Sequence, residues 1–253
     1  SENGFFRFTG KLESMDCLVE DYVYDDLNTT SNQLIYCGIN NLFGEVMWFY
    51  PTSNSNIVDR NVCYSYLDST VNRPIWYTNA STIFKRTTWQ DSSVFGLPHA
   101  TAYDDDDTSF DVTGNTDGTT IYYEHETGVN YIKGGTTYAV PAHILSGDFD
   151  ITQDQRQGIT FRGDGEYMMR VSRFLPDFIS QAGTTSVELG LRNFPNDTLV
   201  SSTLGPFSIT SSSQYKSCRA RGRSVAVKIS NTAIDSNWKL GTFRLDVHAG
   251  GRR

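Results

Sequence analysis

The sequence predicts an all-β protein that is built from antiparallel hairpins. Aromatic residues make up 13% of the chain, including 14 Tyr and 15 Phe, and such residues favour strands. Gly, Ser, Thr and Asn are frequent, whereas long stretches of the helix formers Ala, Leu, Glu and Lys are missing from the sequence. We therefore expect short strands joined by turns along the whole chain.

The expected strands are short apolar and aromatic runs that end at turn residues. The run at 46–50 stops at Pro51. In residues 61–66, Val and Tyr alternate with Asn, Cys and Ser, which is the period of a half-buried strand. The expected strands and closing hairpins are Gly4–Phe8, Val46–Tyr50, Asn61–Tyr66, Ile75–Tyr77, Ile121–Tyr123, Ser186–Phe194, Phe207–Thr210, Ala220–Ser230 and Leu240–Val247.

A change in composition divides the chain into two parts. Gly, Asp and Gln become frequent from Ser146 to Gly165, so we place the boundary between the parts at 147. The spacing of the hairpins is irregular, and it suits a degenerate propeller or a sandwich equally well.

Charge is distributed unevenly along the chain. Residues 216–253 hold nine Lys/Arg and two Asp/Glu, a net charge of +7, whereas the other 215 residues hold 12 and 27, a net charge of −15. A stable nucleic-acid binder normally has a dominant basic surface. Any contact with DNA is therefore expected to be local or transient.

The basic cluster near the C-terminus has two interpretations. Alternation predicts that its arginines share a strand face, which continues into Val225, and that small residues on the opposite face pack closely against another element. The arginines could contact DNA phosphates, or they could form ion pairs and stacking contacts at an interface. We favour the interface, because phosphate contacts would retain DNA. The cluster comprises Arg219, Arg221, Arg223 and Lys228.

No catalytic, metal or cofactor site is predicted. His-Glu-x-x-His, Gly-x-Ser-x-Gly and P-loop patterns are missing from the sequence. Residues 113–124 have the length of a calcium loop, but Thr113 stands at the first ligand position and a strand follows, so we expect a turn. The acidic run Asp104, Asp105, Asp106 and Asp107 is expected to be a solvated loop.

Two further expectations concern His and Cys side chains. His125 lies between Glu124 and Glu126, which point to the opposite strand face, so we expect a structural His that bonds to a backbone group or a Tyr. Because no Cys-x-x-Cys pair occurs, we expect free and mostly buried thiols rather than a zinc site or a disulfide framework. These are Cys17, Cys37, Cys63 and Cys218.

Seven motifs occur in order along the chain. They are Met47–Pro51 with Asp59–Tyr66, Arg86–Trp89 with Val94–Pro98, Ile121–Gly128, Ser146–Asp150, Phe174–Phe178, Arg219–Arg223 and Trp238–Asp246. Together they resemble one family, the tail-hub, nozzle or packaged-DNA-stabilisation proteins of short-tailed bacteriophages. The resemblance covers residues 46–253, about four-fifths of the chain, and family members are longer, so the chain looks like the C-terminal part of one.

The resemblance implies a structural virion protein without enzymatic activity. It implies that residues 1–147 form propeller-like blades and that residues 148–253 form a β-rich region that closes the subunit. The expected partners are other copies in a homohexameric ring, the portal-adaptor ring, tail fibres or tail-tip proteins, double-stranded DNA in passage, and the host cell surface. The expected location is the virion tail, assembled in the cytoplasm of the bacterial host.

Two alternatives stay open at this point. A propeller glycosidase could use carboxylates among the Asp104–Asp107 run, Asp111, Glu124 and Glu126, since any two acids could meet in space. A receptor-binding module could stack sugar rings on exposed aromatics such as Trp48 or Trp76.

Overall fold

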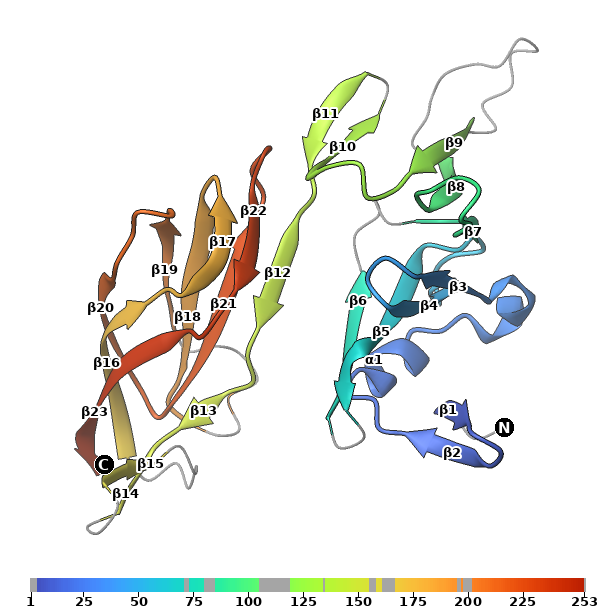
Figure 1. The fold of residues 1–253 in the computed structure, drawn as a ribbon. Coiled ribbons are helices and arrows are strands. Elements are labelled where there is room, and N and C mark those ends of the chain that lie inside the picture. The colour runs from blue at the N-terminus through green and yellow to red at the C-terminus, as the bar shows by residue number, and fades with distance from the viewer. Residues whose placement is uncertain are drawn as a thin grey trace. The chain divides into compact units, whose positions relative to one another are not determined.

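The structure, a computed structural model, describes residues 4–70, 73–79, 85–104, 119–133, 135–154, 158–160, 167–194, 197 and 202–252. All the strand pairs in these residues are antiparallel, which confirms the predicted fold class. The chain forms two compact units, Ser1–Thr127 and Gly128–Arg253. Figure 1 labels the elements of each unit. No helix in the described ranges is long and apolar enough to cross a membrane.

The described residues of the first unit form two meanders, a hairpin and two short helices. Its largest sheet has the order β3-β4-β5-β6, and a second sheet has the order β7-β8-β9. Consecutive antiparallel strands of this kind form propeller blades, but a closed propeller stays a prediction. The elements are β1 (Phe5–Phe8), β2 (Leu12–Met15), α1 (Glu20–Tyr24), η1 (Thr29–Leu34), β3 (Tyr36–Asn40), β4 (Glu45–Tyr50), β5 (Arg60–Thr70), β6 (Arg73–Asn79), β7 (Thr88–Gln90), β8 (His99–Asp104) and β9 (Thr119–Glu124).

Both faces of the four-stranded sheet are buried. Phe5 of β1 and Val23 of α1 pack over one face in a cluster with Val62. The other face carries Phe49 and Cys63, and neither residue is exposed to solvent. The expectation that residues 61–66 form a half-buried strand is therefore wrong, because Leu34, Val58 and Trp89 pack against the Cys63 face, which alternation alone assigned to solvent.

The two meanders meet at a glycine. The Trp89 ring of β7 packs on Gly38 of β3, where an added Cβ would lie 2.7 Å from the ring atom Cδ1. The Trp89 indole N–H also donates a 2.8 Å hydrogen bond to the Ile39 carbonyl. A glycine is needed at this position because any larger residue would displace the indole.

The second unit is a β-sandwich with attached hairpins. One sheet has the order β12-β21-β18-β19, with β13 also paired to β21, and the other has the order β20-β16-β23. The elements are β10 (Asn130–Lys133), β11 (Thr136–Ala139), β12 (Ala142–Leu145), β13 (Phe149–Asp150), β14 (Thr152–Asp154), β15 (Gly158–Thr160), β16 (Tyr167–Leu175), β17 (Phe178–Ala182), β18 (Thr185–Arg192), β19 (Ser202–Ile209), β20 (Lys216–Gly222), β21 (Ser224–Asn231), β22 (Asn237–Leu240) and β23 (Arg244–Arg252).

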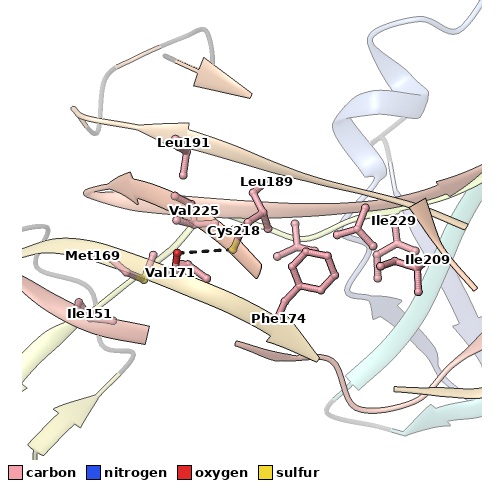
Figure 2. Packing of buried hydrophobic residues seen from close by; sticks show 13 residues of the cluster. Ile151, Met169, Val171, Phe174, Leu189, Leu191, Ile209, Cys218, Val225 and Ile229 are labelled. Carbon is pink, nitrogen blue, oxygen red and sulfur yellow. Dashed lines mark hydrogen bonds between the residues drawn. The ribbon is translucent and has the colours of Figure 1, made fainter. Parts of the chain in front are cut away.

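The core of this sandwich lies between the inner faces of its two sheets (Figure 2). Phe174 of β16 is fully buried, and its ring lies 5.4 Å from that of Phe243, centroid to centroid. β18 alternates strictly, so that Val187 and Leu189 are fully buried and the residues between them are partly exposed. This is the pattern expected of a strand with one face on a core.

The chain changes sheets at Arg223. Its backbone N–H donates to the Arg192 carbonyl at 2.8 Å, between the end of β20 and the start of β21. β20 buries its even-numbered residues, whereas β21 buries the odd-numbered residues from Val225 to Ile229. The expectation that Arg219 and Arg221 share a continuous face with Val225 is therefore wrong. The two strands belong to different sheets that face the same core, so the inward parity reverses between them.

The division into units falls before the boundary expected at 147. β12 and β13 both pair with β21, so residues 142–150 join the second unit as an interrupted edge strand.

The predicted free thiols are present: all four cysteines are free, with two of them buried, Cys17 half-buried and Cys37 exposed.

Candidate functional site

The outer face of the sheet β20-β16-β23 is strongly basic. Arg219 and Arg221 of β20 are exposed, while Cys218, Ala220 and Gly222 between and beside them are buried. The small inward residues allow the close packing that the sequence predicts, because an added Cβ at Gly222 would lie 3.1 Å from the Arg192 carbonyl of β18. Alternation then places the arginines on the outer face of the sheet.

The neighbouring strands add further cations to this face. Arg170 of β16 is the register partner of Arg221 on one side and of His248 in β23 on the other, and all three are exposed. Arg173, three residues after Arg170 and beyond the bulge of β16, is also exposed. We call this surface the basic face, and it comprises Arg170, Arg173, Arg219, Arg221 and His248.

Most arginines of the basic face have no acidic partner in the described part of the chain. Arg173 forms an ion pair with Asp246, and its guanidinium carbon lies 5.7 Å from the centroid of the Tyr215 ring. Among the described residues, no carboxylate or aromatic ring pairs with Arg170, Arg219 or Arg221. Within the described ranges, these three guanidinium groups are therefore exposed and without an acidic partner.

The structure separates the other two members of the predicted basic cluster from this face. Arg223 lies at the crossover between the two sheets and is half-buried. Lys228 lies on β21 in the other sheet of the sandwich, where its Nζ is 3.5 Å from a carboxylate oxygen of Glu188. Only Arg219 and Arg221 of the four predicted residues share a surface.

The acidic loop lies largely outside the described residues. Asp104 ends β8, whereas Asp105, Asp106 and Asp107 are not described, nor is the calcium-like segment 113–118. No group of three or more metal-ligating side chains gathers within the described ranges.

The glutamates beside His125 do not form a catalytic pair with it. Glu124 is exposed at the end of β9, and the Glu126 carboxylate accepts a 3.1 Å hydrogen bond from the Asn40 side-chain amide. Burial raises the pKa of Glu126. The Glu126 carboxylate is thus held by Asn40.

A buried cation near His125 was not predicted from the sequence. Arg86 is only 5% exposed, and its Nε–H donates a 2.9 Å hydrogen bond to Nε2 of His125. Its guanidinium carbon lies 4.0 Å from the centroid of the Tyr123 ring, and the Tyr36 hydroxyl donates to its carbonyl at 3.1 Å. The expectation that His125 bonds to a backbone group or a Tyr through its ring is therefore wrong, since its ring partner is Arg86.

This arrangement fixes the charge state of the imidazole. Burial and, to a smaller extent, the positive charge of Arg86 lower the pKa of His125 to about 3. The ring is therefore neutral and can accept a hydrogen bond from Arg86. Burial lowers the pKa of Arg86 to about 10. No sequence signal joins the two residues, because they lie 39 positions apart in the chain. The pair links the segment just before β7 to the residue that follows β9.

The two tryptophans considered for sugar stacking are partly buried and pack against the core of the first unit. Trp48 and Trp76 pack around Phe5, with ring centroids 5.2 Å and 4.6 Å from it. The Trp76 indole N–H donates to the Asp16 carbonyl at 2.9 Å. Rings held in this way support packing rather than a sugar platform.

The two units carry opposite net charge. Residues 1–127 hold six Lys/Arg and 19 Asp/Glu, a net charge of −13, and residues 128–253 hold 15 Lys/Arg and ten Asp/Glu, a net charge of +5.

Comparison of the sequence with protein-family models and with curated proteins gives no match. The geometry and charge of the described residues therefore carry the functional argument.

Proposed function

We propose that the protein is a structural subunit of the tail of a short-tailed bacteriophage, a nozzle protein whose copies form a ring around the path of ejected DNA. The observation that carries the proposal is the basic face, whose Arg170, Arg219 and Arg221 lack a described acidic partner in a chain whose other unit has a net charge of −13. In such a chain, the exposed arginines of one copy can form ion pairs with acidic side chains of another copy.

Opposite charge on two units of one chain favours a head-to-tail contact. Two acidic units or two basic units repel each other, whereas the basic unit of one copy attracts the acidic unit of the next. A head-to-tail contact is heterologous, and repetition of such a contact closes into a ring when the rotation permits. The homohexamer, the portal-adaptor ring and the tail fibres remain the partners that we propose from the family resemblance.

The acidic unit also suits a conduit for DNA. A wall with net negative charge repels phosphate, so that a duplex is not retained as it passes. If the basic face is covered by a neighbouring copy, its arginines are removed from the DNA path. The arginines then hold the ring together and do not grip the duplex.

The experiment that tests the proposed function is immunogold labelling and negative-stain microscopy of the virions, with the purified protein imaged in parallel. The proposal expects gold at the tail and ring-shaped particles of the purified protein. A monomeric purified protein, together with unlabelled tails, would contradict it. Incubation with host capsule or lipopolysaccharide provides the enzyme control, since release of reducing sugar would favour the glycosidase alternative.

A further inference from the structure

A groove opens between the two edge strands on one side of the β-sandwich. β12 is the edge of the sheet β12-β21-β18-β19, and β23 is the edge of the sheet β20-β16-β23. The groove between them has a volume of about 530 Å³, within the range of ligand-binding pockets. We call it the edge groove, and its apolar lining includes Ile144, Leu145, Phe149, Val227, Leu240 and Phe243.

The edge groove reaches the core of the sandwich. Val227 and Ile229, which line it, belong to the core cluster and are only 7% and 2% exposed. At the opening of the groove, Ile144 is 47% exposed and Leu145 is 62% exposed. Exposed apolar side chains at an unpaired edge strand are unfavourable in water, and burying them under another strand lowers the free energy. The edge groove is therefore suited to an apolar strand.

The first unit carries an apolar hairpin of suitable size. Phe8 and Leu12 are register partners in β1 and β2, and Phe6 lies on the same hairpin face two residues from Phe8. Their exposed fractions are 42% for Phe6, 76% for Phe8 and 70% for Leu12. Phe5 points to the other face, where it is buried and anchors the hairpin against Trp76. A cavity of about 150 Å³ holds one benzene ring, so the edge groove could hold about three such groups.

Charge selects the same pairing of surfaces. The hairpin belongs to the unit with a net charge of −13, and the groove belongs to the unit with a net charge of +5. The one charged residue in the described lining of the groove is a cation, Arg244, which is exposed. The charges of the hairpin itself balance, because Glu13 pairs with Arg7 at 2.8 Å on the opposite hairpin face, and Lys11 and Asp16 lie on either side of β2. An apolar hairpin of the acidic unit thus complements an apolar groove of the basic unit.

We propose that the edge groove receives the β1–β2 hairpin of a second copy of this chain, with Phe6, Phe8 and Leu12 entering it. The inserted side chains complete the core of the sandwich, and the hairpin backbone adds to an edge strand, as in other cases of strand addition. The contact joins unlike surfaces, so it propagates from copy to copy. This proposal rests on the proposed function in one respect, the association of copies.

The test is disulfide cross-linking between two different proteins that each carry one introduced, accessible cysteine and retain the buried Cys63 and Cys218. Cys17 and Cys37 are first replaced by Ser, because they are the two cysteines that are not buried. One protein then carries Phe8→Cys, and the other carries Leu145→Cys and a small tag that changes its size. The two proteins are mixed, oxidised and analysed by non-reducing electrophoresis. The matched control replaces Leu145→Cys by Ile179→Cys, a position in the same unit that is 67% exposed and outside the groove lining.

The proposal expects a heterodimer band in the mixture, at least tenfold stronger than in the control mixture. It also expects that Phe8→Ser and Ile144→Ser each weaken self-association at least tenfold, without loss of folding, because both side chains are exposed. If copies associate but the heterodimer does not exceed the control, the proposed occupant is wrong and the proposed function stands. If the Phe8→Cys, Leu145→Cys double variant forms a disulfide within one chain and no cross-linked dimer, the hairpin of the same chain fills the groove. That result would overturn the proposal. If the wild-type protein neither associates nor cross-links, both proposals fail.

Discussion

Arg170 and Arg221 lie directly opposite each other in the antiparallel ladder between β16 and β20, and both are exposed. Like charges at opposed positions of a sheet destabilise it by roughly 0.2–1 kcal/mol. Within the described residues no carboxylate offsets this repulsion. A partner surface of negative charge would offset it, and this relationship underlies the proposed association of copies.

Arg221→Glu is expected to stabilise the isolated chain while it weakens association. The substitution replaces a repulsion with an attraction across the ladder, so the free energy of unfolding should rise by roughly 0.5–1 kcal/mol. Urea denaturation at a concentration where the protein is monomeric measures this change. Arg221→Gln, which only removes the repulsion, should give a smaller increase. A decrease for both variants would contradict the account of the basic face.

The stability of the first unit should depend on pH through His125. Its pKa is lowered to about 3 in the folded state, whereas an unfolded His titrates near 6.5, so only the unfolded state binds a proton between these values. Stability is therefore fully present above pH 6.5 and falls as pH decreases, by on the order of 1.4 kcal/mol per pH unit. Urea denaturation at pH 7.5, 6.5 and 5.5, followed by tryptophan fluorescence, measures the slope.

The control for this pH dependence is His125→Gln, whose side-chain carbonyl can still accept from Arg86 but does not titrate. The variant should lose stability less steeply than the wild-type protein below pH 6.5. Parallel curves for the two proteins would show that His125 is not held neutral in the folded state.

Gly38→Ala should destabilise the contact between the two meanders of the first unit. The added Cβ would lie 2.7 Å from Trp89 Cδ1, so the indole must move, and overpacking of this kind costs about 1–3 kcal/mol. Thermal unfolding followed by tryptophan fluorescence measures the effect. Gly128→Ala is the matched control, because an added Cβ there meets no described atom within 4 Å. Equal melting temperatures for the two variants would argue against the packing of Trp89 on Gly38.

The cysteines should react with a thiol reagent at very different rates. Cys37 is exposed, whereas burial raises the pKa of the Cys63 thiol to about 12 and leaves almost no thiolate at pH 8. We expect a fast labelling phase that Cys37→Ser removes, and labelling of Cys63 only when the protein unfolds. Mass spectrometry of the labelled peptides assigns each phase. Fast labelling of Cys63 in the native protein would contradict the burial of β5.

Much of the β structure follows from local sequence patterns. The aromatic run at 46–50 and the alternation around Val187 each identify a strand, because a strand's period of two is visible within a few residues. Alternation could not show that residues 61–63 are buried on both faces, since Leu34 and Trp89, which cover the Cys63 face, lie far away in sequence.

The candidate site was only partly predictable for the same reason. Alternation placed Arg219 and Arg221 on one face and the small residues on the other, as the structure shows. The crossover at Arg223 depends on pairing with β16 and β18, so the sequence could not separate Lys228 from the other cations. The Arg86–His125 pair and the edge groove are likewise formed by segments that meet only in the folded chain.

The central claim is that copies associate through opposite charges, and sedimentation velocity tests it most directly. The wild-type protein should sediment as an oligomer at low ionic strength. It should dissociate towards monomer in salt of about 0.5 M, where the electrostatic screening length is below about 5 Å. The triple variant Arg170→Glu, Arg219→Glu, Arg221→Glu should remain monomeric at low ionic strength. The control Arg73→Glu, which alters an exposed arginine outside the basic face, the β1–β2 hairpin and the edge groove, should retain most of the oligomer. A monomeric wild-type protein, or a triple variant that assembles normally, would contradict the account.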